Sequence, residues 1–170
     1  ERLRNPPAVY ISENQTKAVS KLAEFDIQAN NHSDSELQRP IIRNPQTDIT
    51  AEDEIGFDAV ESAMSVLTID KDREKAKTLL ETPALKGNPL ACRHLGLILY
   101  KENKYKTAMK WFEKAALKED PESLRYMGIL FFLGQGVPQD YPTADKWLTK
   151  AAQFGDLEAS RYLRIVKQFY

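Results

Sequence analysis

A sequence repeat is the feature that most constrains how this chain can fold. The segment WFEKAA at residues 111–116 returns as WLTKAA at residues 147–152, an offset of 36. An earlier segment, residues 76–96, aligns with residues 108–128 at an offset of 32. The matched positions include proline, arginine and glycine. They are Ala76 with Ala108, Leu79 with Trp111, Pro89 with Pro121, Arg93 with Arg125 and Gly96 with Gly128. Catalytic motifs are rarely duplicated in so short a chain, whereas stacked units bury the same face repeatedly. The repeat therefore predicts a stack of similar structural units.

The apolar pattern of each unit predicts two helices. In the second of them, Ala108, Trp111 and Phe112 have the i, i+3, i+4 spacing of an amphipathic helix. The first carries an interior glycine, Gly96 in one unit and Gly128 in the next, which costs about 1 kcal/mol relative to alanine. We therefore expect a neighbouring helix to approach closely at each glycine, with a large aromatic ring filling the adjacent space.

The earliest unit is degenerate. Its first helix is predicted over Ala51–Thr68, with Thr50 and Asp53 as a capping box. Its second is predicted over Glu74–Leu85, and Pro83 is expected to end that helix early because proline lacks a backbone donor.

The last stretch of the chain, residues 157–169, matches only a first helix, so we expect it to cap the stack. The end of a solenoid usually needs a polar outer face. This helix instead offers Leu163, Ile165 and Phe169. Two interpretations stay open: the natural chain continues past this point, or this end meets another molecule, which includes self-association.

Four features of the units carry a resemblance to a known family. They are A-x-x-W-F-x-K-A-A at residues 108–116, A-x-x-W-L-x-K-A-A at residues 144–152, a Leu-Gly or Met-Gly pair at residues 95–96 and 127–128, and the loop GQGVPQDY at residues 134–141. This pattern resembles the Sel1-like repeat family, relatives of the tetratricopeptide repeats. The 32-residue spacing of the earlier units looks closer to a tetratricopeptide repeat.

The resemblance covers about residues 57–165 and implies an all-α fold. The expected architecture is an α-solenoid of antiparallel helix pairs, with about three units and a C-terminal capping helix in residues 51–170, after an N-terminal arm and linker in residues 1–50. The family mostly provides scaffolds for protein partners, so the resemblance implies a non-catalytic interaction module, a scaffold or adaptor. It favours a bacterial periplasm or envelope over the cytoplasm.

Arginine recurs in one slot of three successive first helices. In tetratricopeptide relatives these helices line the concave face, so the resemblance implies a groove whose guanidinium groups suit capture of carboxylates. The hypothesis is that this groove binds a protein or peptide segment that is acidic or ends in a free carboxylate. The residues expected to contact it are Arg93, Leu97, Tyr100, Arg125, Ile129, Phe132 and Arg161. The alternative is that each arginine pairs with a neighbouring carboxylate, such as Glu122 or Glu158.

The N-terminal arm supports a second hypothesis. Residues 12–30 predict one short amphipathic helix, and residues 31–48, which are polar and contain two prolines, predict an extended linker. Residues 1–56 hold 6 Lys/Arg and 10 Asp/Glu, a net charge of −4, whereas residues 57–170 hold 18 and 15, a net charge of +3. An acidic arm beside a basic body could dock on its own repeats or swap between subunits, which would make the protein a self-inhibited regulator. A disordered tail is the alternative.

Charge and composition argue against several classes of function. The net charge of −1 argues against nucleic acid as a general partner. No apolar run reaches the roughly 20 residues that a membrane helix needs, so we expect no direct membrane insertion.

Cys92 and His94 are two residues apart and face different directions on a helix. We therefore expect no catalytic site, no metal and no cofactor.

Overall fold

The computed structural model describes residues 16–17, 20, 51–69 and 72–169. In the ranges 51–69 and 72–169 it contains seven helices and no strand, which confirms the predicted all-α fold. The helices are α2 (Ala51–Ile69), α3 (Arg73–Leu85), α4 (Pro89–Lys101), α5 (Tyr105–Ala116), α6 (Pro121–Leu133), α7 (Tyr141–Gln153) and α8 (Leu157–Val166). None of the helices in this part of the chain is long and apolar enough to cross a membrane.

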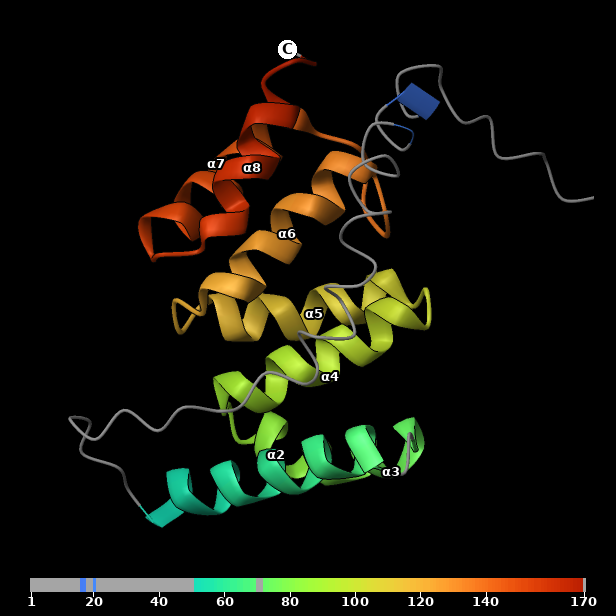
Figure 1. Ribbon diagram of the computed structural model, residues 1–170, viewed down its shortest axis with the longest axis vertical. Helices are drawn as coiled ribbons and strands as arrows, with labels where there is room; N and C mark the ends of the chain where they lie inside the picture. The colour runs from blue at the N-terminus through green and yellow to red at the C-terminus, as the bar shows by residue number, and fades with distance from the viewer. Residues whose placement is uncertain (1–15, 18–19, 21–50, 70–71, 170) are drawn as a thin grey trace, which may run out of the picture.

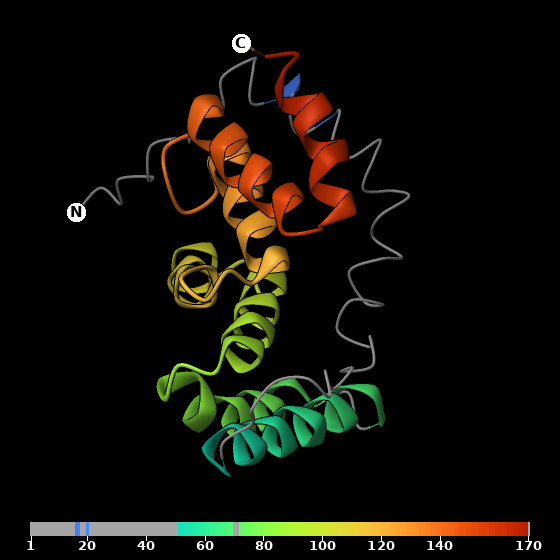
Figure 2. The same cartoon turned by 90° about the vertical axis from the view of Figure 1, so that its left-hand side faces the viewer.

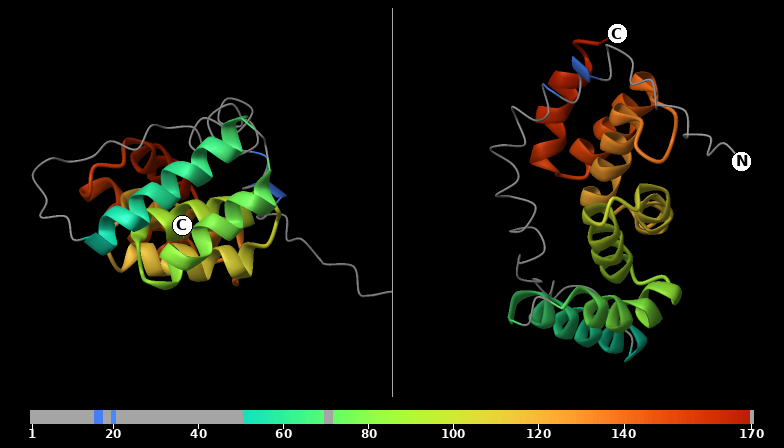
Figure 3. Two further views of the ribbon diagram at one scale, coloured as in Figure 1. Left: turned by 90° about the horizontal axis from the view of Figure 1, so that it is seen from below. Right: turned by 90° about the vertical axis from the view of Figure 1, so that its right-hand side faces the viewer.

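The helices stack in chain order as antiparallel pairs. Each helix packs against the one before and the one after it, so α2 pairs with α3, α4 with α5 and α6 with α7, and α8 closes the series (Figure 1). Contacts also join α2 to α4 and α6 to α8, the first helices of successive units. The stack is bent, with α5 on its outer side (Figures 2 and 3). This is the expected solenoid of helix pairs.

Three equivalent turns connect one unit to the next. Each contains a residue with a left-handed backbone: Gly87, Glu119 and Gly155, with φ of 86°, 62° and 92°. The residue that follows donates its backbone N–H to a carbonyl five positions earlier, which closes the preceding helix as a Schellman motif. That same residue is the N-cap of the next helix: Asn88 for α4, Asp120 for α6 and Asp156 for α8. One residue thus ends one unit and starts the next.

A side chain of the neighbouring helix packs closely on each interior glycine, as expected, but it is an aromatic ring only at Gly96 and a leucine at Gly128. A β-carbon at Gly96 would lie 2.7 Å from Cε1 of Phe112, and one at Gly128 would lie 2.6 Å from Cγ of Leu148. Phe112 and Leu148 are fully buried, whereas Trp111 and Trp147 are half-buried at the edge of the core. The residue after each tryptophan therefore fills the space beside the glycine.

Helix α3 ends at Leu85, as its predicted range does, and Pro83 does not shorten it. It runs through Pro83 to Leu85, so the expectation that proline would end it early is wrong. Pro83 lies in the last turn, where only one intrahelical donor is lost, and the N–H groups of Lys86 and Asn88 close the helix on the carbonyls of Thr82 and Pro83. The predicted cap at Thr50 and the arm in residues 1–50 lie outside the described residues, apart from residues 16–17 and 20.

Candidate functional site

The first arginine of the recurring slot forms a bond between two repeats. Arg93 lies on α4, and its Nη1 donates a 2.9 Å hydrogen bond to Oδ1 of Asp120, the N-cap of α6. Its Nε lies 3.6 Å from Oε2 of Glu122. The second oxygen of Asp120 accepts the backbone N–H of Ser123 at 2.9 Å. One carboxylate thus caps its own helix and holds the arginine of the preceding unit.

The second arginine repeats this arrangement more deeply. Nε of Arg125 on α6 donates to Oδ2 of Asp156, the N-cap of α8, at 2.8 Å. Oδ1 of Asp156 accepts the N–H of Ala159 at 3.0 Å. The side chains of Arg125 and Asp156 are only 4% and 5% exposed, and the guanidinium lies 4.8 Å from the ring centroid of Tyr126. We call Arg93–Asp120 and Arg125–Asp156 the inter-repeat ion pairs.

The third arginine has no such partner among the described residues. Nη1 of Arg161 on α8 bonds to Oε1 of Glu158 in its own helix at 3.0 Å, and its side chain is 53% exposed. An exposed pair of this kind contributes little to stability, because solvent screens it and both side chains lose entropy. Arg161 is the member of the series that another molecule can reach without disturbing the stack.

Of the other residues expected in the groove, three are buried and one is half-buried. Leu97, Ile129 and Phe132 are 1%, 5% and 1% exposed and belong to the hydrophobic core. Tyr100 is half-buried, with its ring centroid 5.3 Å from that of Tyr105 and 5.3 Å from that of Tyr126. Of the seven residues, Arg161, Tyr100 and the partly exposed Arg93 are the ones with accessible surface. Partner binding by this set stays a prediction.

Sequence reasoning anticipated part of the pairing and missed its main acceptors. It named Glu122 and Glu158, which contact Arg93 and Arg161, but it overlooked Asp120 and Asp156. A signal was available: each of these aspartates stands directly before the start of a first helix, where N-caps are expected. Each also follows a slot arginine at a similar spacing, 27 and 31 residues.

The one cysteine and the buried histidine do not form a reactive site. His94 is 2% exposed, and neither ring nitrogen has a hydrogen-bond partner. Burial, aided by the charge of Arg93, lowers the pKa of His94 from 6.5 to about 3, so its ring is neutral at pH 7. Cys92 is buried, donates to the carbonyl of Ala84 at 3.3 Å, and has a pKa raised by desolvation. A thiol of this kind is a poor nucleophile. The described residues also contain no group of three potential metal ligands.

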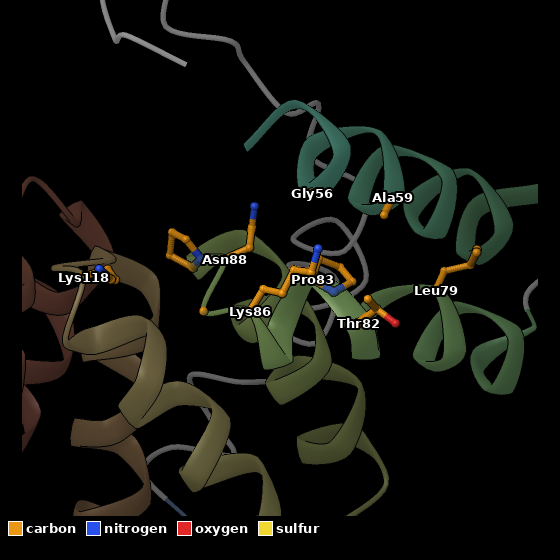
Figure 4. Close-up of a pocket in the computed structure, with 10 residues that line it drawn as sticks. Gly56, Ala59, Leu79, Thr82, Pro83, Lys86, Asn88 and Lys118 are labelled. Carbon is orange, nitrogen blue, oxygen red and sulfur yellow. The ribbon is translucent and has the colours of Figure 1, made fainter. Parts of the chain in front are cut away.

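A pocket opens at the first of the three inter-repeat turns. It has a volume of about 430 Å³ and lies between α2, the end of α3 and the start of α4, with Lys118 of the next turn at its side (Figure 4). Asn88 stands here in place of an N-cap aspartate, and Glu61 of α2 occupies the position that aligns with Arg93 at an offset of 32. Both members of an inter-repeat ion pair are therefore replaced at this junction.

Comparison with known proteins supports the reading of the repeats. The Sel1 repeat model matches residues 89–120 and 121–156, which are α4–α5 and α6–α7 with their following turns. A Sel1 repeat protein from Oxalobacter formigenes, known from its crystal structure, is 28% identical, with a TM-score of 0.53 over 82% of this chain. The match spans 58% of that protein's length. No curated protein sequence matches this chain.

Sel1 repeats generally mediate protein–protein interactions, and proteins built from them are typically non-catalytic. The family model does not match the α2–α3 pair, in line with the degenerate first unit. The helix-pair architecture, the glycine positions and the family-model matches agree: residues 89–156 match two Sel1 repeats, and they lie within a tetratricopeptide-like α-solenoid fold.

Proposed function

We propose that this chain is a non-catalytic protein-interaction module that holds an acidic segment of a protein partner along the inner curve of its repeats. The observation that carries the proposal is the bent stack of helix pairs, which turns the first helices of the matched repeats toward one side and leaves Arg161 at its end exposed. A guanidinium group with accessible surface binds carboxylates in a bidentate manner.

The inter-repeat ion pairs limit which of the slot arginines a partner can bind. Arg93 and Arg125 already hold the carboxylates of Asp120 and Asp156. A partner that took Arg125 would have to replace a buried ion pair, which costs several kcal/mol. Arg161 and Tyr100 can act without that cost, so we assign them the main contacts and Arg93 a supporting one. The proposed partner therefore still binds the predicted groove, but fewer residues contribute most of the binding energy.

Mutation of accessible residues tests the proposal. The full chain is used as bait with extracts of the source cell, and a captured protein is then titrated against purified variants by calorimetry. Tyr100→Ala with Arg161→Ala should weaken binding roughly tenfold or more, because each removes a contact worth about 1 kcal/mol or more. Lys110→Ala, on the exposed face of α5, is the control and should leave the affinity unchanged. Equal affinities for the two variants would place binding elsewhere.

A further inference from the structure

Two positively charged side chains lie at the pocket beside the α3–α4 turn. Lys86 and Lys118 both line it and both are exposed. Among the described residues no carboxylate forms an ion pair with either lysine, although Lys77, Lys104 and three arginines elsewhere do so. Both side chains are positively charged, so a negative group bound at this pocket is favoured on electrostatic grounds.

Exposed leucines lie beside these lysines at equivalent positions. Leu85, the last residue of α3, is 65% exposed, and Leu117, directly after α5, is 78% exposed. The other apolar residues of both helices are largely buried. The two turns read LKGNP at residues 85–89 and LKEDP at residues 117–121, so the pair Leu-Lys recurs at an offset of 32. An exposed leucine followed by an exposed lysine at both turns makes an edge that is alternately apolar and basic. We call Leu85, Lys86, Leu117 and Lys118 the turn edge.

The junction beside this pocket lacks the inter-repeat ion pair of the later junctions. At the next junction the Arg93 side chain reaches across to Asp120. At the first junction Asn88 replaces the aspartate and Glu61, which is exposed, replaces the arginine. Gly56 allows α2 to approach Asn88 closely, because a β-carbon at residue 56 would lie 2.6 Å from Nδ2 of Asn88. Figure 4 shows Lys86, Asn88 and Pro83 near one another and Lys118 on the next turn, on the other side of Asn88.

From these observations we infer that the turn edge and its pocket form a second interaction surface, which binds a partner segment with aspartate or glutamate next to leucine-like side chains. Its carboxylates pair with Lys86 and Lys118, and an apolar side chain of the segment packs against Leu117 or enters the pocket beside Leu79 and Pro83. This inference rests on the proposed role in protein interaction but uses a surface different from the inner curve. It does not need Tyr100 or Arg161.

Three matched peptides test the inference on the full chain. They are acetyl-EELEELEE-amide, its neutral counterpart acetyl-QQLQQLQQ-amide and its apolar control acetyl-EEAEEAEE-amide. Each is titrated into isotope-labelled protein while amide chemical shifts are followed. The first peptide should shift the amides of Gly87, Asn88 and Lys118 and should bind at least about tenfold more tightly than either control, since both the charge and the leucine contribute.

Variants of the chain complete the test. Lys86→Glu with Lys118→Glu should abolish the shifts, and Leu117→Ser should weaken binding severalfold. Lys110→Glu with Lys114→Glu, on the exposed face of α5, makes the same change of net charge and should have no effect beyond a small uniform loss. The inference is overturned if the three peptides bind alike, if none binds, or if the two double variants weaken binding equally. If none of the peptides binds but captured partners still depend on Tyr100 and Arg161, the second surface is rejected and the proposed function stands.

Discussion

Nε of Arg125 and Oδ2 of Asp156 are joined by a 2.8 Å hydrogen bond that crosses from one repeat to the next, in a place where both side chains are nearly inaccessible to solvent. The bond explains why arginine recurs at this position. Each interior slot arginine reaches the N-cap of the following first helix, so it fixes the angle between units as well as their distance. Arg161 on α8 occupies the same slot without such an acceptor among the described residues.

Removing the charge from an N-cap should matter only where an arginine bonds to it. Asparagine caps a helix about as well as aspartate, so Asp120→Asn keeps the cap but leaves Arg93 with the more distant Glu122 alone. We expect the free energy of unfolding to fall by about 2 kcal/mol, because a largely buried guanidinium loses its nearest counter-charge. Urea denaturation measures the change.

Asp140→Asn is the matched control for that experiment. Asp140 is the N-cap of α7, bonds to Thr143 and is fully exposed, and none of the described arginines contacts it. Its substitution should have a clearly smaller effect. Equal losses for Asp120→Asn and Asp140→Asn would show that capping, rather than the bond to arginine, accounts for the stability.

The interior glycines should resist substitution by alanine despite its higher helix propensity. A methyl group at residue 96 would meet the ring of Phe112 at 2.7–3.1 Å, so Gly96→Ala should cost about 2 kcal/mol from overpacking. In a Phe112→Leu background the ring is gone and the cost should largely vanish. Thermal or chemical unfolding of the four proteins in this double-mutant cycle gives the coupling, and a cost of Gly96→Ala that is independent of residue 112 would contradict the packing account.

His94 should make the fold sensitive to acid. Its pKa is lowered to about 3 in the folded chain, while the unfolded chain binds a proton near the ordinary value of 6.5. Above pH 6.5 the histidine has no effect on the pH dependence. Between about pH 6.5 and 3 the unfolded state holds more protons, so the free energy of unfolding should fall by up to about 1.4 kcal/mol per pH unit as the pH decreases.

The variant His94→Leu isolates this contribution from that of the carboxylates. Glu102 also has a lowered pKa, owing to its bonds with Lys104 and Lys77, and it contributes acid sensitivity at lower pH. Between pH 7 and 4 the free energy of unfolding of the native chain should therefore fall more steeply with decreasing pH than that of His94→Leu. Parallel pH profiles would mean that His94 titrates normally in the folded state.

Much of the fold could be predicted because equivalent residues of the repeats make equivalent packing contacts. The alignment of Gly96 with Gly128, and of Phe112 with Leu148 on the neighbouring helices, reflects the close contact seen between successive helices. The end of α3 could not be predicted from Pro83 alone, because a proline in a last turn is compatible with a helix that closes on its following turn. Residue preferences alone therefore do not predict where such a helix ends; the hydrogen bonds of the following turn must also be known.

The candidate site was predicted less completely, for a physical reason. Three arginines in one slot are visible in the sequence, but whether they face solvent depends on the position of Asp120 and Asp156 in the next unit. The side chains of Leu97 and Ile129 share the face of the slot arginines on an isolated helix, yet the packed stack buries them. The turn edge was overlooked because the recurrence of Leu-Lys at an offset of 32 does not reveal that both leucines are exposed.

A double-mutant cycle between Arg125 and Asp156 tests the central claim most directly. The free energies of unfolding of the native chain, Arg125→Met, Asp156→Asn and the double variant give the coupling between the two side chains, and the same cycle with Arg161→Met and Glu158→Gln is measured beside it. Burial predicts a coupling of about 2–3 kcal/mol for the first pair and below about 0.5 kcal/mol for the second. Couplings of similar size for the two pairs would contradict the conclusion that interior slot arginines lock the repeats together while the terminal one is free to bind.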